Sequence, residues 1–319
     1  MKNNPLVLTL DFGTQSVRTA LINKSGEIVY LSKKAYEPVS FALKTGYAEQ
    51  FADFYWDNLV ECLKKLSKEC VENFDDIVGM TVTTFRDSAV LLDENNKPLR
   101  PVILWMDQRL AEAKEKLPAF HRFLFKLVGM KDTVDMNRTR TMAHWIKENE
   151  PEIWAKTKKY VNISTYINYR LTGELADSPG GLTGHYPLYY KKSEWYKEGA
   201  MKGRIFGIPQ RMLPRVVKPG EVIGRLSDEI AKECGLHLRA TNSIENSLDV
   251  LRHICNLNTK RICIWCLQKE VVELVHKTAR SKLYIREIQH EGFFSAVFHE
   301  QLQVLCPYPA LQVGGKNLC

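Results

Sequence analysis

The chain has 319 residues, a formal net charge of +8 and a hydrophobic fraction of 45%, which is typical of a globular protein with one large or two ordinary domains. It contains no run of 18 apolar residues and no secretory signal, so we expect a cytoplasmic protein without a membrane partner. Because no long basic run is interleaved with aromatic residues, the basic excess favours phosphorylated ligands or a solvated surface over nucleic acid.

The first predicted element is a hairpin over residues 6–22, in which two apolar strands flank a polar turn. Gly13 lets the backbone of this turn approach a ligand closely. Asp11, at the end of the first strand, could hold Mg²⁺, which prefers a carboxylate together with waters and phosphates. The side chains that can donate to phosphate oxygens, together with turn N–H groups, are those of Thr14, Gln15, Ser16 and Arg18. An ordinary β-hairpin with a polar tip would explain the same pattern.

Strands and helices alternate further along the chain. A third strand is predicted over residues 27–31 and a fourth over residues 76–84. Between them, apolar residues at helical spacing follow Asp53, a plausible N-cap. The apolar positions of this helix are Trp56, Leu59, Val60, Leu63, Leu66 and Cys70. This alternation indicates an α/β layered domain.

Two short apolar strands, at residues 89–93 and 102–104, each meet a cluster of charged side chains. Arg86 and Asp87 offer a donor fork beside an acceptor, which suits the hydroxyls of a polyol. Trp105 offers a flat apolar face for the C–H side of a sugar. Further polar contacts would come from Asp107 and Arg109. A surface ion pair and a core tryptophan would account for the same residues.

Two helices are predicted in the following segment. Residues 107–128 have a helical pattern that breaks at Pro118, and residues 140–148 have another in which Trp145 faces inward.

Several segments resemble landmarks of the FGGY carbohydrate kinases, the family of glycerol kinase, xylulokinase and gluconokinase. Residues 11–18 resemble the family's first phosphate motif, and residues 84–87 followed by 102–109 resemble its acceptor-binding segment. Further landmarks, in the family's order, are residues 167–173 with Asp177, Leu213-Pro214, Pro219-Gly220 and Ile223-Gly224. Together the landmarks cover about residues 5–236.

The resemblance implies an actin-like ATPase fold of the ribonuclease H-like class, with residues 1–236 as the N-terminal, sugar-binding domain. It implies ATP-dependent phosphorylation of a hydroxyl on a sugar, sugar acid or polyol, with ATP and Mg²⁺ as cofactors and Asp11 acting through the metal. The implied phosphate contacts are Asp11, Gly13, Thr14, Gln15 and Arg18. The implied acceptor contacts are Arg86, Asp87, Trp105 and Asp107.

Residues 105–109 are closer to the sugar kinases of the family than to glycerol kinase, and Asn137 stands where glycerol kinase has a tyrosine that contacts its acceptor. We therefore expect a ketose, a sugar acid or a longer polyol as the substrate. The sequence is compatible with a homodimer.

Residues 237–319 do not match the family. Where the family has a Gly-Asp or Ser-Asp element that carries its general base, this segment has a single aspartate, Asp249, and five of the eight cysteines of the chain. An appended module is one interpretation, in which Cys263 and Cys266, near His253 and Cys255, would bind zinc or do redox chemistry. The abrupt loss of landmarks favours a second interpretation, out-of-frame translation after about residue 237. A divergent or truncated natural paralogue is the third.

The catalytic base is therefore unassigned. We expect a kinase-like chain without turnover of its own, and a non-catalytic sugar-binding or regulatory module is the alternative function.

Overall fold

The computed structural model of the protein describes residues 5–70, 76–218 and 221–236. All of them belong to one compact unit, Met1–Trp265. The three interpretations of residues 237–319, the metal-binding module, the out-of-frame segment and the natural paralogue, lie outside the described residues.

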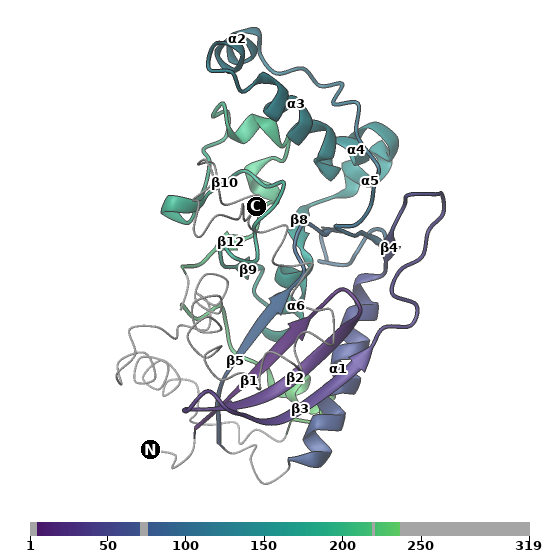
Figure 1. The fold of residues 1–319 in the computed structure, drawn as a ribbon, viewed down its shortest axis with the longest axis vertical. Helices are drawn as coiled ribbons and strands as arrows, with labels where there is room; N and C mark the ends of the chain where they lie inside the picture. Colours follow the sequence, from purple (N-terminus) through teal and green to yellow (C-terminus); the bar gives the residue numbers. More distant parts are fainter. Residues whose placement is uncertain (1–4, 71–75, 219–220, 237–319) are drawn as a thin grey trace, which may run out of the picture. The chain divides into compact units, whose positions relative to one another are not determined.

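A mixed four-stranded sheet contains the predicted hairpin (Figure 1). Its strand order is β3-β2-β1-β5. β1 pairs with β2 in antiparallel fashion and with β5 in parallel fashion. The strands are β1 (Leu6–Phe12), β2 (Ser16–Asn23), β3 (Ile28–Ala35) and β5 (Ile77–Thr84). This arrangement confirms the α/β class and the hairpin at its start.

The helix α1 (Ala52–Glu69) packs against β2 and β3, and Figure 1 shows it running along this sheet. All six of its predicted apolar positions are buried. The N-cap prediction was wrong: Phe51 occupies that position and Asp53 lies in the first turn. The Asp53 carboxylate instead accepts hydrogen bonds from Tyr166 Oη at 2.5 Å and Arg170 Nη1 at 2.7 Å, so a tertiary contact outcompetes the local cap.

A second, antiparallel sheet has the order β4-β7-β6-β8. Its strands are β4 (Glu49–Gln50), β7 (Val102–Ile103), β6 (Ala89–Leu92) and β8 (Lys159–Asn162). The helix α6 (Ile163–Thr172) follows β8 directly and ends at Gly173, whose φ of 77° is the left-handed conformation that glycine tolerates best. Leu8 and Leu10 of the first sheet share one hydrophobic core with Val90 and Val161 of the second.

The segment after β7 departs from the prediction. Residues 107–117 form no helix, and α2 begins only after Pro118. The backbone N–H groups of Glu112 and Lys114 donate to the Glu148 carboxylate at 2.8 and 2.7 Å, so they are not available for helical hydrogen bonds. The helix predicted over residues 140–148 begins only at Met142, because the backbone of Thr141 is extended and not helical.

The remaining elements are short. The helices are α2 (Ala119–Leu127), α3 (Lys131–Arg140), α4 (Met142–Asn149), α5 (Pro151–Lys156) and α7 (Asp228–Glu233). The strands are β9 (Ala176–Asp177), β10 (Leu188–Tyr189), β11 (Glu194–Trp195) and β12 (Arg215–Val216). The 3₁₀ turns are η2 (Tyr190–Lys192), η3 (Gly203–Ile205) and η4 (Gln210–Met212).

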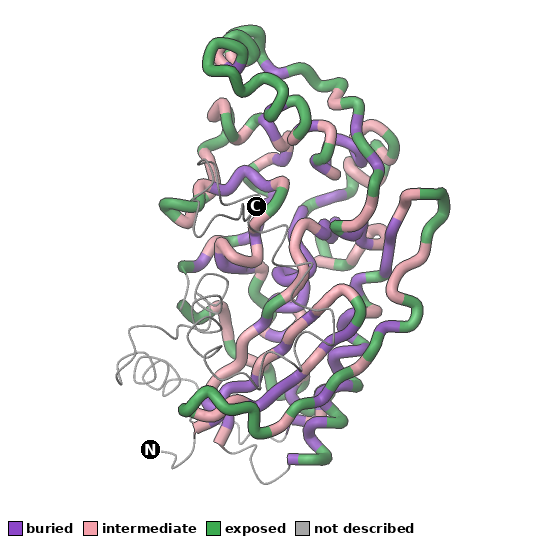
Figure 2. The backbone as a smooth tube through the Cα atoms, viewed as in Figure 1, coloured by how far each residue is buried: buried purple, intermediate pink, exposed green. Residues whose placement is uncertain are grey.

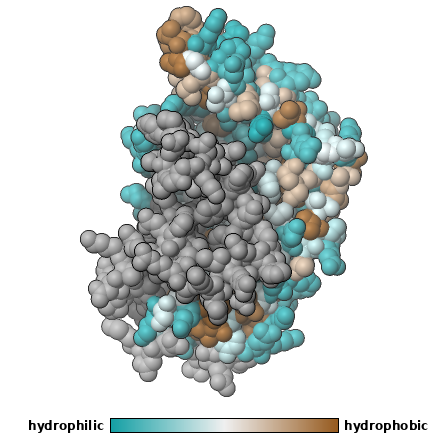
Figure 3. All heavy atoms as spheres, in the orientation of Figure 1, coloured by the Kyte–Doolittle hydropathy of each residue, from teal (hydrophilic) through white to brown (hydrophobic). Residues whose placement is uncertain are grey.

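The helix α2 is much more exposed to solvent than the strands of the second sheet. Figure 2 shows α2 mostly exposed and the strands of the second sheet mostly buried. Phe120, Phe123 and Leu127 are 66%, 60% and 70% exposed, and hydrophobic residues are visible over α2 at the top of Figure 3. Among the described residues, no helix is both long and apolar enough to span a membrane.

Candidate active site

The parallel pairing of β1 with β5 brings two predicted site segments to one edge of the first sheet. Asp11 lies opposite Thr83, and the Phe85 N–H donates to the Phe12 carbonyl at 3.0 Å. The turn after β1 and the Arg86-Asp87 pair after β5 therefore start from adjacent strand ends. Loops at such an edge commonly build the binding site of an α/β sheet.

The hairpin turn is held on both sides. The Gly13 N–H donates to the Ser16 carbonyl at 2.9 Å, and the Gln15 carbonyl accepts from the Tyr36 N–H at 2.9 Å. Arg18 lies directly opposite Asp11, with Nη1 3.2 Å from the Asp11 Oδ2. Burial raises the pKa of the Asp11 carboxyl, and Arg18 offsets part of that rise.

Trp105 connects this turn to the second segment. Its Nε1 donates to Thr14 Oγ1 at 3.3 Å, and its backbone N–H donates to Ser88 Oγ at 3.0 Å. The residue is 42% exposed, so it is not a core tryptophan. Trp105 therefore contacts the hairpin turn through its ring and Ser88, the residue that follows Asp87, through its backbone.

Asp87 has the left-handed backbone conformation, with φ of 58°, which is uncommon for a residue with a side chain. Its carboxylate is held by His185: Oδ1 accepts from the His185 N–H at 3.0 Å, and Oδ2 lies 2.5 Å from His185 Nδ1. A Cβ on Gly184 would lie only 2.6 Å from Asp87 Oδ1. Strained residues of this kind cluster at functional sites.

Sequence reasoning missed Gly184 and His185. His185 is 98 residues from Asp87 in the sequence, so no local spacing connects the two. The available signal was the Gly-His pair itself, which follows the landmark at Asp177 by a short loop. Arg86 is partly buried beside Asp87.

Asp107 lies in a buried ionic network. Its side chain is 1% exposed and forms two hydrogen bonds with Arg109 at 2.7 Å. It also accepts from the Ala48 N–H at 2.6 Å, while Arg109 pairs with Glu49 at 2.7 Å. The Arg109 guanidinium lies 3.8 Å from the centre of the Tyr47 ring. The geometry therefore places Asp107 as a support of the Trp105 segment, without an open face for a ligand.

Asp177, a family landmark in the sequence, is also buried. It accepts hydrogen bonds from Ser164 Oγ at 2.5 Å, Thr165 Oγ1 at 2.9 Å and the Ser178 N–H at 2.8 Å. Burial raises its pKa to about 6, against the opposing effect of these donors. Its role is to fix the start of α6 to β9.

The residues that could hold Mg²⁺ are few. Among residues 5–70, 76–218 and 221–236, no three His, Cys, Asp or Glu side chains gather as a metal cluster. Asp11 is 35% exposed in its side chain. One accessible carboxylate fits Mg²⁺ held mainly by phosphates and waters, and does not fit an all-protein site.

Two cavities, of about 300 and 400 Å³, are lined by residues of the segment 112–213 and by none of the site residues above. A single cleft shared by Asp11, Arg86, Asp87 and Trp105 therefore stays a prediction.

Solved structures share this fold. A gluconate kinase from Lactobacillus acidophilus matches with a TM-score of 0.58 and 22% identity, over 73% of this chain and 46% of that one. A xylulose kinase from Rhodospirillum rubrum matches with the same TM-score and identity, over 73% and 48%. The fold is thus the actin-like, ribonuclease H-like α/β fold of the sugar kinases.

Sequence comparison specifies the family. Residues 6–242 match the N-terminal domain of the FGGY family of carbohydrate kinases, and the chain belongs to that family. A xylulose kinase from Lactococcus lactis is 28% identical over 71% of this chain and 44% of its own length. An L-fuculokinase from Salmonella typhi is 29% identical over 72% and 48%. The chain therefore spans about half the length of the curated relatives that it matches.

Proposed function

We propose that residues 1–236 are the acceptor-binding domain of an ATP-dependent sugar kinase whose substrate is a ketose, a sugar acid or a longer polyol. The observation that carries the proposal is the contact between Trp105 Nε1 and Thr14 Oγ1 at 3.3 Å. It joins the segment suited to a sugar to the turn suited to phosphate. Xylulose kinases and L-fuculokinases among the relatives support this substrate class.

The residues take complementary roles in this proposal. Turn N–H groups, Thr14, Gln15 and Arg18 donate to phosphate oxygens, since charged donors bind these strongly. Trp105 stacks against the apolar face of the sugar, while Arg86 and Asp87 bind its hydroxyls. His185 and Gly184 position Asp87, and Asp107 positions the Trp105 segment through Arg109.

Asp11 would hold Mg²⁺ in concert with ATP phosphates. When bound, the ion neutralises charge on the transferring phosphoryl group. In the reaction, the acceptor oxygen forms a bond to the γ-phosphorus, the bond from that phosphorus to ADP breaks, and the hydroxyl proton passes to a base.

The base remains unassigned, since the sequence after residue 236 lacks the Gly-Asp or Ser-Asp element. General-base assistance contributes about 10²–10⁴-fold in rate, so we expect sugar binding with little or no turnover from this chain. A non-catalytic sugar-binding module is the second candidate, and the missing base favours it for the chain as it stands.

The test compares binding with turnover on the full chain. Isothermal titration with a panel of pentoses, hexoses, sugar acids and polyols should reveal binding, while a coupled ADP-release assay with the same panel should show none above background. Trp105→Ala should weaken sugar binding, and Trp105→Phe, which keeps a flat ring, should retain most of it. Phe51→Ala, on an exposed aromatic outside the site, is the control.

Sugar binding that Trp105→Ala leaves unchanged would contradict the site. Phosphorylation of a sugar at an ordinary rate would contradict only the prediction that this chain is inactive. It would indicate that a residue outside the family landmarks acts as the base.

A further inference from the structure

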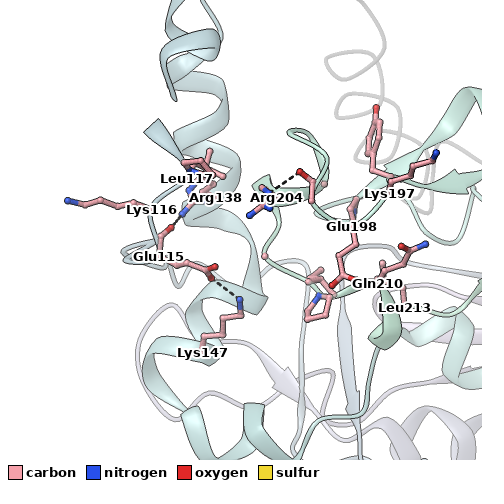
Figure 4. A pocket seen from close by; sticks show the side chains of 18 residues that line it. Glu115, Lys116, Leu117, Arg138, Lys147, Lys197, Glu198, Arg204, Gln210 and Leu213 are labelled. Atoms are coloured by element: carbon pink, nitrogen blue, oxygen red, sulfur yellow. Dashed lines mark hydrogen bonds and ion pairs between the residues drawn. The ribbon is translucent and has the colours of Figure 1, made fainter. Parts of the chain in front are cut away.

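The cavity of about 300 Å³ lies apart from the candidate active site. Figure 4 shows one wall built from residues near Glu115, α3 and α4, and the opposite wall from the segment that carries Glu198 and Arg204. Its volume is at the small end of ligand pockets, which span about 300–1,000 Å³. The charged side chains that line it are Glu115, Lys116, Arg138, Lys147, Lys197, Glu198 and Arg204. Five of these side chains are cationic and two are carboxylates, and Figure 4 shows Lys116 pointing away from the cavity.

Arg138 is the unusual member of this lining. The residue is 5% exposed, yet among the described residues it forms no ion pair with a carboxylate. Its Nη2 donates to the carbonyls of Ala113, at 3.3 Å, and Glu115. Burial lowers the pKa of Arg138, and the charges of Glu115, Asp135 and Glu148 offset only part of that effect. None of these carboxylates forms an ion pair with the guanidinium, so an anion in the cavity would supply the direct contact that they do not make.

Arg204 faces the same cavity from η3. Its Nε donates to the Gly199 carbonyl at 2.9 Å, and it too has no ion pair within the described part of the chain. Gly199 lies so close that a Cβ there would be 3.4 Å from Arg204 Nη2. The backbone thereby orients the guanidinium, and both of its Nη groups remain available as donors.

The acidic residues of the cavity do not cancel this charge. Glu115 is already paired with Lys147, whose Nζ lies 2.9 Å from the carboxylate, and that hydrogen bond lowers the Glu115 pKa. Glu198 is the one carboxylate of this lining without an ion pair among the described residues, but it is exposed, so solvent screens its charge.

We propose that this cavity binds a small multivalent anion, a phosphomonoester or a polycarboxylate, between the guanidinium groups of Arg138 and Arg204. The planar fork of arginine matches both phosphate and carboxylate oxygens. Lys147 adds a third donor. Such a site is separate from the phosphate turn at Thr14 and does not depend on the proposed kinase function.

Isothermal titration of the full chain with inorganic phosphate and, separately, with citrate tests the proposal and distinguishes the two ligand sources. Arg204→Gln should weaken binding of the preferred anion about tenfold or more, because a charge-assisted bidentate contact is lost. Arg211→Gln removes an equal charge from an exposed arginine outside the cavity and should leave the affinity unchanged. Arg18→Gln reports on any binding at the hairpin turn.

Modification by phenylglyoxal, mapped by mass spectrometry, adds a readout that does not depend on a variant's folding. The bound anion should protect Arg204 and leave Arg211 reactive. The proposal is overturned if neither anion binds at tens of millimolar, or if Arg204 is not protected. It is also overturned if only Arg18→Gln abolishes binding, which would assign the anion to the phosphate turn.

Discussion

Asp87 shows how a strained residue is stabilised by a distant segment. Its φ of 58° is unfavourable for a residue with a side chain, and both carboxylate oxygens are held by His185. The strain persists because these contacts, and the absence of a side chain on Gly184, determine the position of Asp87.

His185→Ala should therefore reduce sugar affinity without abolishing folding. The loss of one charge-assisted hydrogen bond predicts roughly tenfold weaker binding, measured by titration with the tightest-binding sugar of the panel. His121→Ala, on α2, should bind that sugar as the unchanged protein does. Equal affinities for both variants would remove Asp87 from the acceptor site.

Asp177 predicts a specific pH dependence of stability. Its folded-state pKa of about 6 lies above the ordinary value of 3.8, so the folded protein binds this proton more tightly than the unfolded chain does. The contribution to the free energy of unfolding is complete below about pH 4 and is lost as the pH rises through 6. A two-unit shift corresponds to about 3 kcal/mol.

Asp177→Asn should flatten the pH profile of the free energy of unfolding between pH 4 and 7, measured by urea denaturation. Asp132→Asn, on a fully exposed carboxyl, should keep the original slope. Identical profiles for all three proteins would show that Asp177 titrates normally.

At the scale of elements, the buried ionic network holds β4 against the segment after β7. Arg109 bonds to both Asp107 and Glu49 at 2.7 Å. Burial disfavours the charge on Arg109, but these carboxylates outweigh that effect and raise its pKa. The network fixes the segment from which Trp105 projects.

Arg109→Ala should lower the free energy of unfolding by about 3–5 kcal/mol, because it leaves the Asp107 carboxylate buried without an ion pair. Glu49 would keep its ion pair with Arg100 at 2.7 Å. Thermal and urea unfolding measure the loss, and Arg140→Ala, on an exposed arginine at the end of α3, should cost little. A small effect of Arg109→Ala would mean that water replaces the guanidinium.

Much of the first sheet, including the turn that carries the proposed phosphate contacts, could be predicted because the signals are local. The strands around Leu8 and Thr19, the turn at Gly13 and the helical spacing after Asp53 each occupy one short stretch. The irregular chain over 107–117 could not be predicted, since its N–H groups bond to Glu148, 36 and 34 residues away. His185 was missed for the same reason.

For the whole molecule, the end of the described chain is part of the main core. Ala231, Cys234 and Leu236 are buried in the cluster that contains Leu8. Trp56 Nε1 of α1 donates to Glu233 Oε1 at 2.8 Å, and Ser67 Oγ donates to the Gly235 carbonyl at 2.6 Å. The proposed N-terminal domain should therefore extend through residue 236.

A chain that ends after Leu236 should be folded, and one that ends after Leu226 should be less stable by about 4 kcal/mol, since it loses the apolar burial of α7 and its flanks. Urea denaturation of the two truncated chains measures the difference. Equal midpoints would place the domain boundary before α7.

We propose that residues 237–319 arise from out-of-frame translation. Sequencing the gene around codon 237 should show another frame that encodes a Gly-Asp or Ser-Asp element and then continues. If neither other frame is open, and zinc binds to Cys255, Cys263 and Cys266 in the purified protein, the segment is instead a metal-binding module.

The position of β1 in its sheet also affects how the protein is made. β2 ends at residue 23, but β5, the other neighbour of β1, begins only at residue 77. At about 5–20 residues per second, the ribosome leaves the apolar edge of β1 unpaired for several seconds. Exposed edges of this kind pair with other chains. A translational pause before β5 emerges should promote aggregation of the nascent protein, whereas the same pause after residue 84 has left the ribosome should not.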